Sequence, residues 1–185
     1  MDKNLYRQVG DRRYRESVGL YYEDFELGVV VEHRPGRTIA EADNVWFTHL
    51  TMNPHPLHFD AHFAAHTEWK RPLVNSCLTL AMVTGMSVTS TSRNAVSNLG
   101  WDKVRLTAPV FVGDTIYAES TILSKRPSDT RPGQGVVTVE TKGVKQDGEH
   151  VKLCNRLVAR LRDGHAGLRD LKVPWPDESN GRTLT

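Results

Sequence analysis

The ten residues from Thr51 to Asp60 gather two histidines, an asparagine, an aspartate and two prolines. Each proline fixes its own φ and disfavours helix at the residue before it, so this segment is predicted to be a stiff loop. An imidazole can exchange a proton near neutral pH, and an amide can hold water by donating and accepting. His58 and Asn53 could therefore activate a water molecule. The plainer interpretation is a proline turn with a surface histidine.

A metal site is an alternative interpretation of the same region. His58, His62 and His66 recur at intervals of four residues, and three imidazoles on one helix face would form a zinc-binding set. Pro56 argues against a single helix through all three, because proline removes a helical hydrogen bond and clashes with the preceding turn. We therefore predict no metal here.

Helical patterns lie on both sides of this loop. Residues 40–50 place apolar side chains at helical spacing, which predicts an amphipathic helix with Trp46 in the core. Thr38 is predicted to cap this helix, with Glu41 completing a capping box. A short helical pattern follows at residues 61–66. Residues 76–89 leave almost no polar face, so they predict a central buried helix that is capped by Asn75 or Ser76.

The remaining segments are rich in β-forming residues. One, at residues 29–33, ends at a predicted Pro35–Gly36 turn. Four more follow the central helix, and the last two are joined by Asp147–Gly148, a strong hairpin signal. These four segments are residues 98–108, 114–126, 134–146 and 149–163. One buried helix with several antiparallel strands predicts an α+β fold, in which a curved antiparallel sheet wraps a long central helix.

Composition bounds the class of protein. The chain has 185 residues, of which 25% are charged and 38% hydrophobic, which suits one soluble globular domain. A net charge of +2 is too small to predict nucleic-acid binding. No apolar run approaches the roughly 20 residues that cross a bilayer, and no secretory signal is visible. Cys77 and Cys154 read as buried free thiols of a reducing compartment. We predict a cytoplasmic protein that binds neither membrane nor nucleic acid.

Two motifs resemble those of a known family. The loop resembles the form Thr-Gly-Asp-x-Asn-Pro-Leu-His of the MaoC-like dehydratases and (R)-specific enoyl-CoA hydratases, and Ala108 to Asp114 resembles their strand-turn-strand segment. The resemblance implies a single hot-dog domain over residues 20–163. Residues 1–19 would then be an N-terminal arm, and residues 164–185 a C-terminal extension.

The resemblance also implies roles for individual residues. Thr51 keeps the leading threonine, whereas Met52 stands where the family has glycine and Asn53 where it has the catalytic aspartate. His55 stands at the asparagine position, and His58 matches the catalytic histidine. The implied reaction is the reversible hydration of an enoyl-CoA thioester to a 3-hydroxyacyl-CoA. His58 would be the acid and base, and Asn53 would orient water.

Other residues are given supporting roles by the same resemblance. Asp60 could orient the imidazole of His58, with His55 nearby. Asn75, Ser76 and Cys77 lie where relatives open the central helix, so they are expected to form the oxyanion and substrate-binding site. The phosphates of coenzyme A could meet basic residues, for which the candidates are Lys70, Arg71, Arg93 and Arg105.

The Thr-Met-Asn form of the loop resembles a branch that acts on branched C5 dicarboxylic acyl-CoA esters such as mesaconyl- or itaconyl-CoA. Because Asn53 replaces an aspartate, a non-catalytic acyl-thioester-binding subunit of a two-chain dehydratase is the alternative. A hot-dog thioesterase is disfavoured, since residues 76–89 contain no carboxylate. The family implies no cofactor beyond coenzyme A as part of the substrate, and a homodimer or dimer-based hexamer whose sheets join.

Overall fold

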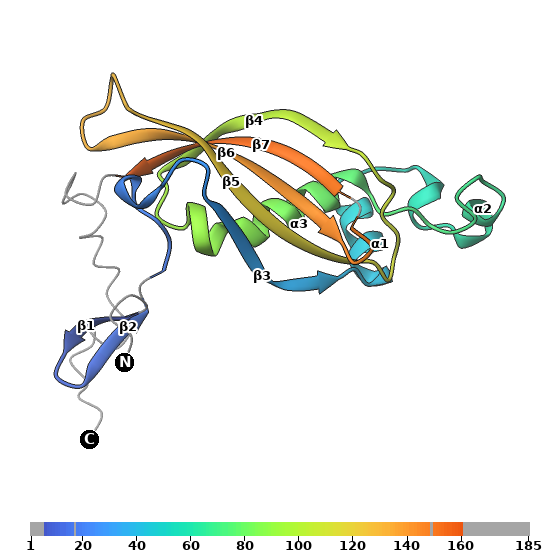
Figure 1. Cartoon of the computed structure of the whole chain (residues 1–185). Coiled ribbons are helices and arrows are strands. Elements are labelled where there is room, and N and C mark those ends of the chain that lie inside the picture. The colour runs from blue at the N-terminus through green and yellow to red at the C-terminus, as the bar shows by residue number, and fades with distance from the viewer. Residues whose placement is uncertain (1–5, 17, 149, 161–185) are drawn as a thin grey trace.

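Five antiparallel strands curve around one helix in a computed structural model that describes residues 6–16, 18–148 and 150–160 (Figure 1). The strand order in the sheet is β3-β5-β6-β7-β4. These strands are β3 (Val30–Thr38), β4 (Ser97–Leu106), β5 (Thr115–Pro127), β6 (Gln134–Lys145) and β7 (His150–Arg160). The central helix is α3 (Ser76–Ser87). The predicted α+β arrangement is confirmed.

The core lies between α3 and the concave face of the sheet. Inward residues alternate along β5 and β6, as the two-residue period of a strand requires. One buried cluster joins the helix, the sheet and the loop before β5, and a second lies under the other end of the sheet. The first contains Ile39, Val74, Leu78, Val83, Val110, Ile116 and Ala118; the second contains Phe25, Ile122, Val137, Val139 and Ala159.

Helix α1 (Glu41–Leu50) buries the face opposite to the predicted one. Asn44 and Thr48 are 1% and 0% exposed, whereas Trp46 and Leu50 are 77% and 79% exposed. The prediction that Trp46 belongs to the core is therefore wrong. The two buried polar side chains hydrogen-bond to neighbouring segments, which offsets the cost of removing them from water. The apolar face is left uncovered in a single chain.

The predicted cap of α1 is also wrong. Thr38 is the last residue of β3, and its hydroxyl hydrogen-bonds to that of Thr115 at 2.7 Å. The helix starts after Ala40, whose N–H donates to the carboxylate of Asp43 at 2.9 Å. Thr38 belongs to β3 rather than to the helix because the pairing with β5 continues to that residue.

Helix α3 begins as predicted, with Asn75 as its N-cap, and continues into a π-helical turn, η3 (Val88–Ser92). One face, which includes Leu78 and Val83, is buried against the sheet. The opposite face is not buried, and Cys77 is exposed. The predictions of burial all round the helix and of a buried Cys77 thiol are therefore wrong for the single chain. The Cys154 side chain lies outside the described side chains.

The N-terminal arm contains a hairpin of β1 (Tyr6–Gly10) and β2 (Arg13–Glu16), which stands away from the sheet (Figure 1). A 3₁₀ turn, η1 (Tyr22–Asp24), follows. Strand β3 runs through the predicted Pro35–Gly36 turn, with a shift of register between His33 and Arg37. No helix among the described residues is long and apolar enough to cross a membrane. The predicted extension, 164–185, lies outside the described residues.

Candidate functional site

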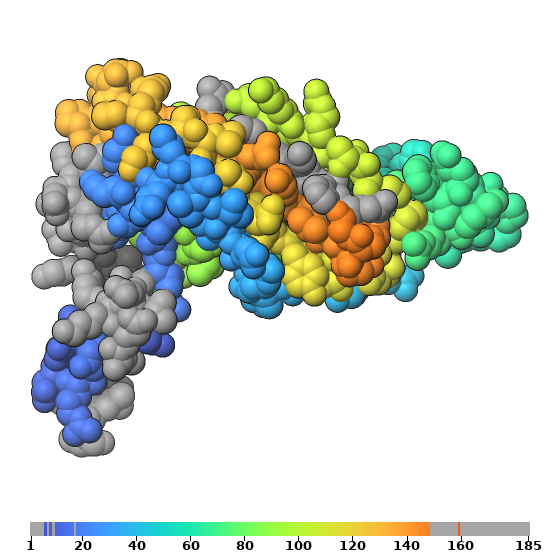
Figure 2. All heavy atoms as spheres, in the orientation of Figure 1, coloured from blue at the N-terminus to red at the C-terminus, as the bar shows by residue number. Residues whose placement is uncertain are grey.

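The loop after α1 is held by local hydrogen bonds. The N–H of Asn53 donates to Thr48 O at 3.0 Å, and its side-chain oxygen accepts the N–H of His55 at 3.0 Å. This second bond closes a turn of the type that asparagine favours. The next residues form η2 (Pro56–His58) and then α2 (Ala61–Ala65), which projects beyond the end of the sheet (Figures 1 and 2). The loop is non-helical before Pro56, as predicted, but Pro56–His58 form a 3₁₀ turn, which the prediction of a fully non-helical segment missed.

His58 is half-buried and has one ring nitrogen engaged. Its Nδ1 lies 2.9 Å from the main-chain oxygen of Leu73. A carbonyl oxygen can only accept, so Nδ1 carries the proton and Nε2 of the neutral ring carries a lone pair. Main-chain geometry therefore selects the tautomer in which Nε2 can accept a proton.

Asp60 does not have the predicted orienting role. Its Oδ1 accepts the N–H of Phe63 at 2.9 Å and so caps α2, while Leu73 supplies the partner of His58. His55 is exposed, and its ring centre lies 5.9 Å from that of His58. Because Nδ1 of His55 accepts the N–H of Leu57 at 3.2 Å, this histidine stabilises the turn that presents His58.

Asn44 is a site residue that sequence reasoning missed. Its Nδ2 donates to His58 O at 2.7 Å and to Leu73 O at 3.2 Å, and its Oδ1 accepts the N–H of Asn75 at 2.8 Å. Thr48 Oγ1 accepts from Nδ2 of Asn75 at 3.3 Å. Asn44 and Thr48 lie four residues apart on one helix face, and two polar residues at that spacing were the available signal.

The start of α3 offers one main-chain donor. Asn75 is buried, and its Oδ1 accepts the N–H of Cys77 at 3.0 Å. The predicted role of Cys77 as an oxyanion donor is therefore wrong, since the capping side chain already takes its N–H. Within the described part of the chain, the N–H of Ser76 has no hydrogen-bond partner. Such an amide, at the positive end of a helix dipole, suits an oxyanion.

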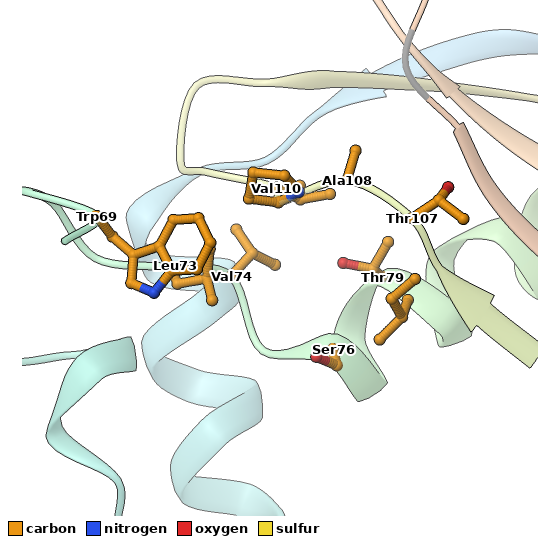
Figure 3. Close-up of a pocket in the computed structure, with 10 residues that line it drawn as sticks. Trp69, Leu73, Val74, Ser76, Thr79, Thr107, Ala108 and Val110 are labelled. Carbon is orange, nitrogen blue, oxygen red and sulfur yellow. The ribbon is translucent and has the colours of Figure 1, made fainter.

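A cavity of about 310 Å³ lies beside this donor, between the start of α3, the segment before it and the end of β4 (Figure 3). Ser76 lines it directly. Leu73, whose carbonyl holds His58, also lines it, whereas His58 and Asn53 do not. No hydrogen bond joins Asn53 to His58 among the described residues. The cavity is lined by Trp69, Leu73, Val74, Ser76, Thr79, Leu106, Thr107, Ala108, Pro109 and Val110.

The predicted basic residues lie in different places. The guanidinium of Arg71 stacks 3.9 Å from the ring centre of Phe111, whose ring also contacts Trp69 in the cavity wall. Lys70 is its exposed neighbour. Arg93 follows η3, at the opposite end of the helix from Ser76, and lies 3.9 Å from Glu16. Arg105 donates to its own strand. Arg71 is thus linked to the cavity wall through the rings of Phe111 and Trp69.

The alternative metal interpretation does not hold. Helix α2 starts only at Ala61, so His58 is not on the helix that carries His62. His62 and His66 are neighbours, with ring centres 4.7 Å apart. Across residues 6–16, 18–148 and 150–160, no group of three or more potential ligands could hold a metal ion.

A curved antiparallel sheet wrapped around one long helix defines the hot-dog class of folds. A solved structure of a Mycobacterium tuberculosis protein described as a double hot-dog fold matches with a TM-score of 0.71, over 80% of this chain and 47% of that chain, at 21% identity. At that identity the match establishes the fold alone.

The chain belongs to the MaoC-like family, because the profile of the MaoC like domain matches residues 24–145. It is 33% identical to a mesaconyl-CoA hydratase of Cereibacter sphaeroides over 161 residues, 86% of this chain and 47% of that protein. A solved structure described as a MaoC domain dehydratase from Chloroflexus aurantiacus matches with a TM-score of 0.74, over 78% of this chain and 41% of that chain, at 33% identity. The chain spans about half the length of the curated relatives it matches.

Proposed function

We propose that the chain catalyses the reversible addition of water to an enoyl-CoA thioester, giving a 3-hydroxyacyl-CoA. The observation that carries this proposal is the His58 tautomer. Nδ1 is hydrogen-bonded to Leu73 O, which leaves Nε2 as a base, and Leu73 lines the same cavity as Ser76, whose N–H is the proposed oxyanion donor. His58 is thus joined through Leu73 to a cavity that Ser76 lines, and a base and an oxyanion donor are the groups that conjugate addition of water requires.

In the proposed reaction, water gives a proton to Nε2 of His58 while its oxygen bonds to the β-carbon. The electrons of the carbon–carbon double bond move toward the thioester oxygen, where the N–H of Ser76 stabilises the enolate charge. The imidazolium then returns the proton to the α-carbon as the enolate collapses. The net change is one water added across the double bond. Asn53 would donate from Nδ2 to the water, because its Oδ1 already accepts from His55.

A short acyl group suits the cavity. Its volume of about 310 Å³ is at the lower end of the range for ligand sites, which argues against a long chain. The relative named mesaconyl-CoA hydratase supports a C5 dicarboxylic ester such as mesaconyl- or itaconyl-CoA. Arg71, whose guanidinium stacks on the ring of Phe111, is proposed to bind a phosphate of coenzyme A. The reaction consumes only water and thioester, so it calls for no metal or redox cofactor, and we propose a cytoplasmic location.

A homodimer is proposed through strand β4. β3 and β4 form the two edges of the sheet, and both contain register shifts, but β3 also contains Pro35, and a proline protects an edge from pairing. β4 instead exposes Leu99, Trp101 and Leu106, and its side chains stand out along the upper edge in Figure 2. The uncovered apolar face of α1 would be a second contact if dimers assemble into a hexamer.

The test is turnover of a panel of crotonyl-, mesaconyl-, itaconyl- and long-chain enoyl-CoA by the wild type and His58→Gln. Loss of the conjugated thioester is followed by absorbance, and the itaconyl ester by mass. We expect hydration of a C5 ester and a loss of at least about 10²-fold in kcat for the variant. Unchanged activity in His58→Gln would overturn the mechanism. Binding without turnover of any ester would instead support a non-catalytic subunit of a two-chain dehydratase, which Asn53 in the aspartate position favours.

A further inference from the structure

One short loop, Val110 to Asp114, holds both segments that form the site. Val110 O accepts the N–H of Val74 at 2.8 Å, and Phe111 pairs with Leu73 in an isolated antiparallel bridge. At its other end, Asp114 O accepts the N–H of Ile39 at 2.9 Å, directly before α1. We call residues 110–114 the clamp loop. The position of the clamp loop fixes the position of the Leu73 carbonyl, and the Leu73 carbonyl in turn fixes the ring of His58.

The carboxylate of Asp114 sets the shape of the clamp loop. Its Oδ2 accepts the N–H of Phe111 at 3.0 Å, and its Oδ1 accepts Nε2 of Gln146 at 3.0 Å. Burial raises the pKa of Asp114, but the hydrogen bonds from Gln146 and Phe111 and the charge of Lys145 outweigh this, so the pKa is lowered from 3.8. The group is therefore ionised at neutral pH.

Lys145, at the end of β6, places a buried ammonium behind this carboxylate. Its Nζ lies 3.4 Å from Asp114 Oδ2 and 3.1 Å from Asp147 Oδ2, and Lys145 and Asp114 are only 6% and 7% exposed. Desolvating such a pair is costly, and replacing buried ion pairs by apolar residues is often neutral or stabilising. Stability alone therefore explains the pair poorly, whereas a need to fix the clamp loop explains it directly.

We propose that Lys145 and Asp114 are positioning residues for the hydration reaction. The connection runs from Lys145 through the Asp114 carboxylate to the main chain of Phe111, from there across the bridge to Leu73, and from the Leu73 carbonyl to Nδ1 of His58. The hydrogen bond of this bridge runs from the N–H of Val74, two residues before Ser76, to Val110 O. The pair thus fixes the position of the base, His58, relative to the oxyanion donor, the N–H of Ser76. This inference rests on the proposed function.

The test compares two lysine-to-methionine changes on the same strand. Lys145→Met removes the buried charge, and Lys142→Met is the matched control, since Lys142 pairs with Glu119 at 3.6 Å at a part-exposed position away from the clamp loop. We expect Lys145→Met to lose at least roughly tenfold in kcat with KM changed less than about twofold, because misplacement costs rate more than binding. Lys142→Met should keep both values, and Lys145→Arg should recover most of kcat.

Two further measurements separate positioning from folding. Asp114→Asn removes the charge without changing size, so it tests the pair if Lys145→Met does not fold. The downfield proton resonance of His58 Nδ1–H reports the bond to Leu73 without any substrate; we expect it to shift or broaden in Lys145→Met and not in Lys142→Met. A full kcat and an unchanged resonance in a folded Lys145→Met, or equal losses in both lysine variants, would overturn the inference. A wild type that turns over no ester contradicts the proposed function instead, and the resonance still decides the positioning role.

Discussion

The side chain of Asn44 donates to the main-chain oxygen of His58 at 2.7 Å, across 14 positions of sequence. This bond ties the turn that carries the base to the buried face of α1. The same amide reaches Leu73 O and the N–H of Asn75, so one side chain joins the three segments of the site. The buried face of α1 thus supplies hydrogen bonds to the site, and the uncovered apolar face is free to meet another chain.

Replacing Asn44 by alanine is expected to damage stability and rate together. The change leaves two carbonyl oxygens and one N–H without their buried partner, and each such group costs about 1–3 kcal/mol. We expect the free energy of unfolding to fall by roughly 2–4 kcal/mol and kcat to fall at least about tenfold. Urea unfolding and initial rates measure this. Glu41→Ala, at an exposed position of the same helix, is the control; equal behaviour of the two variants would contradict the role of Asn44.

Two substitutions of Asn53 separate its structural role in the turn from its proposed role in orienting water. Asn53→Asp keeps an oxygen to accept the N–H of His55, so its melting temperature should match the wild type, whereas Asn53→Ala loses the turn and about 1 kcal/mol of stability. If the amide orients water, the alanine variant also loses about tenfold in kcat. Thermal unfolding and steady-state rates are the measurements. Full turnover by Asn53→Ala would remove this residue from the reaction.

The N-cap of α3 should contribute to both stability and geometry. Asn75→Ala removes the acceptor of the Cys77 N–H, and loss of such a cap costs about 1 kcal/mol. Asn75→Asp keeps the capping oxygen but loses the donor to Thr48, so we expect a smaller loss. Chemical denaturation of the two variants gives the comparison. An alanine variant at least as stable as the aspartate variant would contradict the capping role.

Buried His33 predicts a fall in stability on mild acidification. Its ring nitrogens lie 2.6 Å from Ser90 Oγ and 2.7 Å from Ser120 Oγ. Burial first, and the charge of Arg34 second, lower the pKa of His33 from 6.5, with Glu119 acting in the opposite direction. The unfolded state therefore binds a proton more readily. The resulting contribution to the free energy of unfolding is complete above pH 6.5 and is lost as pH falls through the lower pKa of the folded state.

Urea unfolding at pH about 7.5 and about 5.5 measures this dependence. We expect His33→Gln to be less stable than the wild type at the higher pH and to lose less stability between the two. His62→Gln, at an exposed position, should retain the wild-type slope. An unchanged slope in His33→Gln would show that other groups govern the response.

Strand β4 predicts the effect of a charge at the proposed dimer contact. Trp101 is 49% exposed on this edge strand, and lysine at an edge opposes pairing. Trp101→Lys is therefore expected to convert a dimer into a monomer, as measured by sedimentation. Leu123→Lys, an exposed apolar position on β5 inside the sheet, should remain dimeric. If Trp101→Lys remains dimeric, β4 does not form the dimer contact.

Local patterns determined much of this protein. The run from Ser76, the Asp147–Gly148 turn and the alternation along β5 and β6 were sufficient for the central helix and its sheet, because helix and strand periods are properties of neighbouring residues. The two prolines of the loop likewise predicted that the chain leaves the helix before Pro56. The motif by itself predicts His58 as the acid and base, and this role stays a prediction.

Only the tertiary structure decided which groups those residues meet. Hydrophobic periodicity predicted that Trp46 is buried in the core. Asn44, on the opposite face of α1, is buried instead, because it hydrogen-bonds to main-chain groups of distant segments. The ring of His58 hydrogen-bonds to Leu73 O rather than to Asp60. The N–H of Cys77 donates to the capping side chain of Asn75, so it is not available to a ligand. A hydrogen bond between segments depends on where each segment packs, and no spacing along the chain records that position.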